Sequence, residues 1–297
     1  MALFDRAYKL TIGALIQPPV DPVTGRRTIG PSFADVREYA DLRIAFEIVK
    51  SMDESVNTAK IDITNISPAT EDFLKRSKNT KVILDVGYTQ ENQAGESLFT
   101  ILKGDIVDVK KTFARPDKIV TLNIGDGERA LQDSKANKTY AAGTPLKQIA
   151  LEKISELGVA ISASAKLFLD ENIKEALESP LNANGRIKDV LDQIFRRFGI
   201  RWKVQNDEVI IFDPAATGEL ILMDFESGLL SEPDEIEEGR IRAQSLLNPR
   251  VQPGQTIQLQ ATTLEGFFKV ERVRHVGDSH SGDWITETDL NNAAPAQ

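Results

Sequence analysis

The sequence predicts a mainly β protein with an α+β middle region, in which antiparallel β regions that form a sandwich or barrel flank a smaller helical/β module. Near both ends of the chain, polar and apolar residues alternate in short runs, which is typical of half-buried strands. Gly- and Pro-containing turns separate these runs, and this spacing favours a sandwich or barrel over a parallel sheet. Clear helical periodicity is confined to the middle. We therefore expect domains at residues 1–125, 126–213 and 214–297.

The composition is that of an ordinary globular protein. The 297 residues are 41% hydrophobic and 27% charged, and this length favours two or three modules that each bury a core. The chain has no Cys, which excludes disulfides, thiol catalysis and Cys-based zinc sites. No apolar run is long enough to span a bilayer, and the N-terminus lacks the pattern of a signal peptide. We expect a soluble chain that is made inside a cell, without membrane insertion.

The first 125 residues carry about six strand patterns and one helix pattern, enough for a sheet that closes on itself. Ser67-Pro68 is a capping residue followed by a proline at the first helical position, so a short helix is expected as far as Arg76. The expected strands are Tyr8–Ile16, Leu42–Val49, Ala59–Thr64, Val82–Thr89, Leu98–Val109 and Ile119–Ile124.

A loop is expected from Val20 to Phe33, because this segment is rich in Pro and Gly. Long ordered loops in compact domains are often contact elements. We therefore take Arg26, Arg27 and Phe33 as candidate interface residues. A loop with no contact role explains the same residues as well.

The middle region begins with a bend at Gly125–Glu128, which has neither the glycine spacing of a phosphate loop nor the alternating acids of a calcium loop. Apolar residues then recur at helical spacing from Thr144 to Leu157, and Gly158 stands where a left-handed cap belongs. A second helix is expected over Arg186–Phe198. Two strands flank Asn206-Asp207, which is typical of a two-residue hairpin turn.

The C-terminal region is expected to form four antiparallel strands. Pro253-Gly254, Glu265-Gly266 and Gly282-Asp283 mark the turns between them, and a break of the alternation at Val273 indicates a bulge. The expected strands are Gly239–Pro249, Thr256–Ala261, Phe267–His275 and Trp284–Leu290.

This C-terminal region is also strongly acidic. Residues 214–297 contain fourteen acidic and six basic residues, a net charge of −8, whereas the whole chain has −9. Five of the acids fall within Glu232–Glu238, which we interpret as a solvated acidic loop. Such a region should repel a phosphate backbone, so sequence-specific binding of nucleic acid is not expected.

Few residues suggest chemistry. His275, Asp278 and His280 could provide metal ligands, but a hairpin turn after a strand explains the same residues. No Ser-His-acid grouping is present, and no two acids fall in a recognisable apolar pocket, although the composition does not exclude a carboxylate pair. We therefore expect no catalytic residues, no cofactor, and a protein that is not an enzyme.

The order of these regions, together with several phrases of the sequence, resembles the baseplate hub proteins of contractile-tailed bacteriophages and tailocins, which are related to the hub region of type VI secretion spike proteins. Each phrase alone is a weak motif of turn and strand residues, and the set is specific because of its order. The matching phrases are Asn57–Ser67, Gly125–Glu128, Ser227–Pro233, Ser245–Pro249 with Pro253-Gly254, and Val273–Trp284.

The resemblance implies that both β regions are tail-tube-like antiparallel β-barrel domains, and that the chain is made in the host cytoplasm and acts in the tail baseplate. It also implies a homotrimer that presents six barrels to the six-fold tail tube and a three-fold end to the central spike, as part of the DNA ejection channel of the virion. The implied partners are the tail tube protein, the central spike protein, other baseplate proteins and tape measure proteins. The alternatives are a distal tail or tube-initiator protein, the spike hub of a type VI secretion system, and a cell-wall-acting hydrolase built on β modules.

Overall fold

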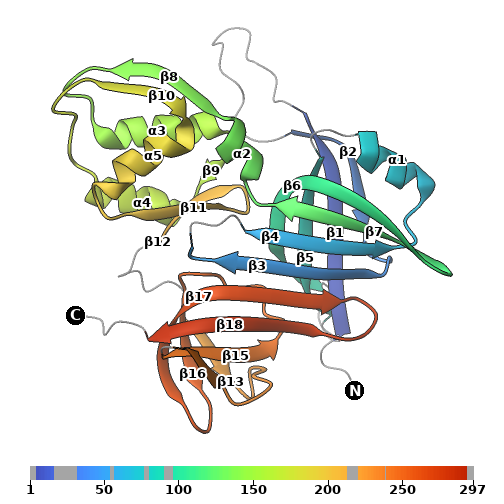
Figure 1. The fold of residues 1–297 in the computed structure, drawn as a ribbon. Helices are drawn as coiled ribbons and strands as arrows, with labels where there is room; N and C mark the ends of the chain where they lie inside the picture. Colours follow the sequence, from blue (N-terminus) through green and yellow to red (C-terminus); the bar gives the residue numbers. More distant parts are fainter. Residues whose placement is uncertain are drawn as a thin grey trace. The chain divides into compact units, whose positions relative to one another are not determined.

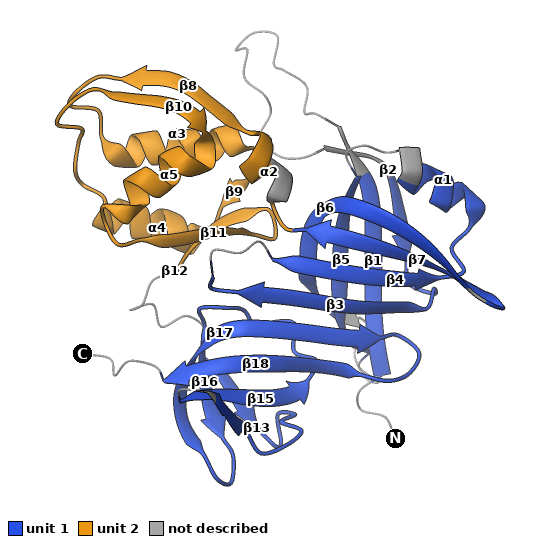
Figure 2. Ribbon diagram, in the orientation of Figure 1, with its two compact units in different colours: residues 1–16, 33–125, 215–297 blue, residues 17–32, 126–214 orange. Residues whose placement is uncertain are grey.

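One sheet of 13 strands dominates the computed structural model (Figure 1), and among its strand pairs with a described register only β13 with β16 is parallel. The structure describes residues 5–16, 32–53, 57–76, 80–89, 96–212, 220–237 and 239–292. The chain divides into two compact units (Figure 2). We call residues 1–16, 33–125 and 215–297 the β unit, and residues 17–32 and 126–214 the α+β unit. The mainly β fold class expected from the sequence is confirmed.

The N-terminal lobe of the β unit is built from seven strands and one helix in the order β3-β4-β7-β6-β5-β1-β2. Alternate residues are fully buried, as in Ile44, Phe46 and Ile48, because successive side chains of a strand point to opposite faces. The elements are β1 (Asp5–Ile16), β2 (Ser32–Tyr39), β3 (Ile44–Ser51), β4 (Thr58–Thr64), α1 (Pro68–Arg76), β5 (Thr80–Thr89), β6 (Glu96–Ala114) and β7 (Asp117–Gly125).

The sequence predicted six of these strands and α1. It missed β2, whose sequence has only a weak alternation, and it placed the end of β6 at Val109, five residues before the strand ends at Ala114. Phe33 therefore belongs to a strand rather than to the expected loop. The turn at Arg115–Asp117 is confirmed.

The C-terminal lobe of the β unit contains six strands. The main path continues β17-β18-β15-β14, while β16 pairs with β17 and β13 pairs with β16 in parallel. Its core is a second cluster of buried side chains that includes Val270, Val273 and Leu290. The strands are β13 (Ile221–Asp224), β14 (Asp234–Glu237), β15 (Arg240–Leu246), β16 (Thr256–Gln260), β17 (Glu265–Asp278) and β18 (Trp284–Asn292).

The four strands expected in this region are confirmed, and two predictions need correction. Glu265-Gly266 is not the turn but the start of β17, since the N–H of Ala261 donates to the carbonyl of Leu264 and closes the turn earlier. The acidic run was interpreted as a loop, yet Asp234–Glu237 forms a strand because it pairs with β15. The expected bulge is present, between Val270 and Arg272.

The α+β unit has its own core, formed mainly by the apolar faces of two helices. The expected helices and the hairpin are confirmed: Gly158 ends α3 in the left-handed region at φ 74°, and Asn206 and Asp207 also have positive φ. The elements are α2 (Glu128–Asp133), β8 (Lys135–Tyr140), α3 (Leu146–Leu157), β9 (Ala160–Ile161), α4 (Ala163–Asn172), β10 (Leu181–Arg186), α5 (Ile187–Arg196), β11 (Arg201–Gln205) and β12 (Glu208–Phe212).

Crossing a bilayer as a helix requires about 20 consecutive, mainly apolar residues, and the helices among the described residues are shorter. None of the helices there combines the length and the apolar character that crossing a bilayer requires.

Candidate assembly interface

The two lobes of the β unit join edge to edge along a seam between β3 and β17. The two strands are antiparallel, and their register runs from Ser51 opposite Arg272 to Ala45 opposite Asp278. The path β14-β15-β18-β17-β3-β4-β7-β6 is therefore continuous through both lobes (Figure 1). Since a ladder of backbone hydrogen bonds fixes this junction, the lobes form one structural body.

The inward side of the seam is tightly packed around Gly277. The rings of Phe46 and Trp284 meet edge to face at a centroid distance of 5.4 Å, and Gly277 lies opposite both residues in the register. A Cβ at position 277 would come within 2.4 Å of the Phe46 ring and 2.7 Å of the Trp284 ring. Glycine is therefore required here by close approach.

Two arginines of the N-terminal lobe hold the end of the seam. Arg6 donates to the carbonyl oxygens of Asp278 at 2.5 Å and Gly282 at 2.6 Å, and Arg43 donates to the Asp278 carboxylate at 2.8 Å. Partial burial raises the pKa of Asp278, but the hydrogen bonds from Arg43 and from the N–H of His280 outweigh that effect and lower it. Asp278 thus acts as an ionised anchor between the lobes.

The opposite side of the same strands is a polar face of paired charges. Arg274 donates to Glu47 of β3 and to Glu287 of β18, each at 2.8 Å, and both bonds raise the pKa of Arg274. Arg242 pairs with Asp289 at 2.7 Å. Lys60 and Asp62 on β4 continue the pattern at 2.8 Å. We call this surface the polar face. Its acids and bases neutralise one another, although the C-terminal region as a whole is acidic.

A buried carboxylate anchors the β6–β7 hairpin to helix α1. Glu71 is 6% exposed and accepts from Lys111 of β6 at 2.9 Å and from Lys118 of β7 at 3.0 Å. Hydrogen bonds between charged groups are stronger than neutral ones, and a buried charge requires such partners. The carboxylate therefore fixes the position of the hairpin that carries the far end of β6.

Replacing Glu71 with Gln is expected to lower the free energy of unfolding by about 1–2 kcal/mol, because two charge-assisted hydrogen bonds become weaker while both lysines can still reach water. Denaturant unfolding of the purified chain measures this change. Glu47→Gln is the matched control, since its partner pair is exposed and should cost less than about 0.5 kcal/mol. Equal effects of the two substitutions would contradict the anchoring role of Glu71.

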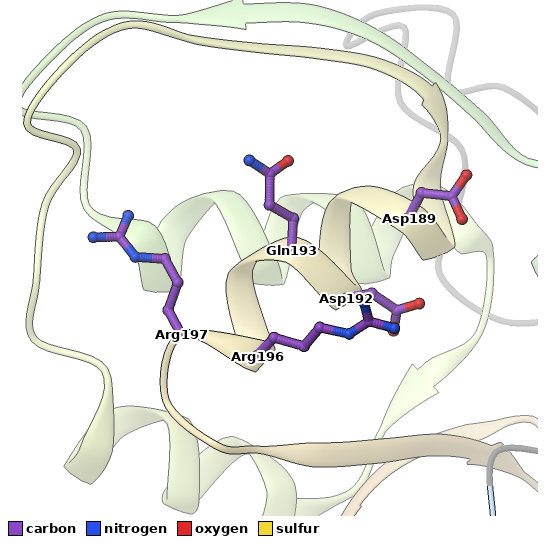
Figure 3. A pocket seen from close by; sticks show the side chains of 5 residues that line it. All are labelled: Asp189, Asp192, Gln193, Arg196 and Arg197. Carbon is purple, nitrogen blue, oxygen red and sulfur yellow. The ribbon is translucent and has the colours of Figure 1, made fainter.

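A shallow hollow of about 520 Å³ lies over helix α5 of the α+β unit, lined by the five residues labelled in Figure 3. Its carboxylates are engaged: Asp189 pairs with Arg186 at 3.1 Å, and Asp192 accepts from the Trp202 indole at 2.8 Å. Arg197 lies 3.8 Å from Glu175. This pattern is that of a solvated helix face.

The interface candidates from the sequence fall largely outside the described residues. Arg26 and Arg27 lie wholly outside them. Phe33 is part of β2, but the position of its side chain is not among those described. Their role as interface residues stays a prediction.

The metal candidates do not share one site. His275 is fully buried with its Nδ1 2.9 Å from the Thr286 hydroxyl, Asp278 is paired with Arg43, and His280 is exposed. Within the described ranges, no three His, Asp or Glu side chains are grouped so that they could hold a metal ion.

The residues of the seam were missed by sequence reasoning. Arg6, Glu47 and Arg274 are separated by up to 268 positions, and each alone is an ordinary charged residue of a strand. A signal was present in the alternation of Arg272 and Arg274 with apolar residues, and in the matching Glu287 and Asp289 of the next strand. That pattern predicts a charged sheet face, although not its partner strand.

Two β lobes share one sheet, and the α+β unit is inserted between them in the sequence; this fold is similar to that of solved tail proteins. A 43 kDa tail protein of prophage MuSo2 from Shewanella oneidensis superposes with a TM-score of 0.62 at 8% identity, over 96% of this chain and 98% of that one. A tail protein from Neisseria meningitidis gives 0.59 at 10% identity, over 95% and 96%. An E. coli type VI secretion component, described as similar to the T4 tail proteins gp27 and gp5, gives 0.51 at 12% identity, over 86% and 74%.

The sequence itself identifies the family. Residues 29–272 match the family described as baseplate hub gp41, and the chain belongs to that family. No curated protein matches the chain. The resemblance found in the sequence is thereby confirmed: this is a structural protein of the phage tail, and its family implies a place in the tail baseplate.

Proposed function

We propose that the chain is a trimeric baseplate hub that adapts the six-fold tail tube to the three-fold central spike and forms part of the DNA ejection channel. Its role is geometric rather than catalytic. Its partners are further copies of itself, the tube protein, the spike protein, and other baseplate and tape measure proteins. The proposal also retains the three domains expected at 1–125, 126–213 and 214–297.

The observation that supports this proposal is the repeated strand plan of the two lobes. In the N-terminal lobe the order is β5-β6-β7-β4-β3, and in the C-terminal lobe it is β16-β17-β18-β15-β14. The second strand of each series, β6 or β17, is long, carries a bulge, and pairs with a different neighbour along each half. One chain therefore carries two similar β lobes, and three chains carry six.

The polar face supports the channel part of the proposal. A wall along which DNA moves must not hold the phosphate backbone, because unpaired cations bind it through release of counterions. On the polar face, Arg242 and Arg274 are each bound to a carboxylate. A face on which these two cations are neutralised suits the lining of a conduit.

The test is the mass of the hub in its assembled state. Native mass measurement of baseplates or of hub–spike complexes is expected to give three copies of the chain per hub. The assembled state is required because an adaptor of this kind can stay monomeric until its partners are present. A single copy per hub in complexes that contain the spike would overturn the proposal.

A further inference from the structure

We propose that β14 of one copy pairs with the far half of β6 in a neighbouring copy, so that the sheet of the β unit continues from chain to chain. The far half of β6 is the segment Asp108–Phe113. The inference rests on the proposed trimer and names the two edges that would build it.

The first argument is the equivalence of the lobes. Within the chain, the far half of β17 has β18 on one side and β3 on the other, and β3 is the fifth and last strand of the series β5-β6-β7-β4-β3. The strand that corresponds to β17 is β6, and the strand that corresponds to β3 is β14. If the junction between chains repeats the junction within a chain, β14 takes the place beside β6 that β3 takes beside β17.

The second argument is that both edges are open. Along Asp108–Phe113, β6 pairs with β7 on one side, and no strand among the described residues occupies the other. β14 likewise pairs only with β15 within the described part of the chain. Phe113 is 70% exposed and Val107, next to this edge, is 54% exposed. Open edges with exposed apolar side chains are templates for pairing with another chain.

Strand direction permits this pairing. Every neighbouring pair on the path from β14 to β6 is antiparallel, and the path has eight strands. Directions therefore alternate along it, and the strands at its two ends point in opposite senses. When a second copy continues the sheet, its β6 is antiparallel to the β14 that it meets, as β17 is to β3.

The third argument is the charge of the two edges. Asp234 and Glu235 of β14 are exposed, and Asp234 lies opposite Arg242, which places it on the polar face. Lys110 of β6 projects from the polar face as well, with a side chain that is 69% exposed and 3.5 Å from Asp108. Asp234 beside Lys110 would be a favourable contact between opposite charges, whereas two acidic β14 edges would repel each other.

This combination selects a head-to-tail contact between different edges, which generates a ring when its rotation closes. A two-fold contact of β14 with β14 would instead place like charges together. The inferred partner is therefore a second copy of this chain, joined in the order β14 to β6.

Disulfide trapping tests the contact directly, because the chain contains no natural Cys. Asp234→Cys is combined in turn with Asp108→Cys, Lys110→Cys or Thr112→Cys, three alternate positions of β6 on one face. Two Cys bridge only when their Cβ atoms approach to about 4 Å, so one member of the series should match the register. Lys60→Cys with Asp234→Cys is the control, since β4 is flanked by strands on both sides.

The variant whose β6 position matches the register is expected to yield species of two and three chains when oxidised tails are run on a non-reducing gel. The Lys60 control is expected to yield only single chains. Exchange of charge gives an independent readout that needs no bridge. Lys110→Glu should weaken association about fivefold per interface, and adding Asp234→Lys should restore it.

If none of the three variants bridges while the hub still has the mass of three chains, the inference is overturned and the proposed trimer stands. Bridging of Asp234→Cys to a chain of another mass would also overturn it, since a different protein would then occupy the edge. A hub containing one copy would overturn both.

Discussion

Lowering the pH from 7 to 4 is expected to destabilise the β unit by about 3 kcal/mol through His275 alone. Burial lowers the pKa of this histidine from 6.5 to about 3, helped by the nearby positive charge of Lys50 and opposed weakly by the backbone of Val251. In the unfolded chain the histidine is therefore protonated below about pH 6.5, whereas in the folded chain it stays neutral down to about pH 3. Across this window, stability falls as the pH falls, by about 1.4 kcal/mol per pH unit.

The surroundings of His275 explain why it stays neutral. It lies at the seam, where Lys50 of β3 is also fully buried and Thr286 of β18 is 2.9 Å from its Nδ1. The carboxylates nearest in register, Glu47 and Glu287, are on the polar face, on the other side of the strands. Neither neighbouring strand therefore places a carboxylate where it could stabilise the positive charge of a protonated His275.

Denaturant unfolding at pH 7, 5.5 and 4 measures the effect. His275→Phe is the control, because a ring that cannot titrate removes this contribution while filling much of the same volume. The variant should lose less stability than the parent between pH 7 and 4, by about 3 kcal/mol, whatever its stability at pH 7. Parallel pH profiles for the two proteins would show that His275 does not set the acid sensitivity.

The elements predicted well from the sequence are those whose signals are local. The hairpin at Asn206-Asp207 and helix α3 with its Gly158 cap depend on residues within a few positions of one another, and both are confirmed. Strands with strong alternation, such as β4 and β16, were found for the same reason.

Elements that become strands only through pairing, and not through their own sequence pattern, were missed. β14 consists of Asp234–Glu237, a sequence that favours solvent, and it forms a strand only because β15 lies beside it. β13 has four residues and pairs with a strand more than thirty positions away. Short strands carry too few residues for a periodic signal, so whether such a segment forms a strand depends on its pairing in the folded structure.

The same limit applies to the seam between the two lobes. The polar and apolar periods of β3 and β17 are visible in the sequence, but their pairing joins residues more than 220 positions apart. Nothing in either strand specifies the other. Family resemblance could therefore indicate a two-barrel hub, whereas the strand edges that lack a second partner among the described residues follow only from the strand order.

Replacing Gly277 with Ala is expected to destabilise the β unit by about 2–3 kcal/mol. The added methyl group would lie 2.4 Å from the Phe46 ring and 2.7 Å from the Trp284 ring, and the two rings already touch edge to face, so neither can yield without displacing the other. Because Phe46 belongs to β3 and Trp284 to β18, the strain falls on the junction of the lobes. Thermal and denaturant unfolding measure the loss.

Phe46→Leu tests whether the clash with the Phe46 ring causes the loss of stability, since it removes the ring atoms that the methyl group would contact. Alone it should cost about 1 kcal/mol as a change of buried apolar volume. Combined with Gly277→Ala it should cost less than the sum of the two single changes by at least about 1 kcal/mol, which is the coupling expected of residues in contact. Strict additivity would mean that the strain lies elsewhere. If the seam holds the lobes at the spacing that assembly requires, Gly277→Ala tails should also contain fewer hubs, and the double variant should recover them.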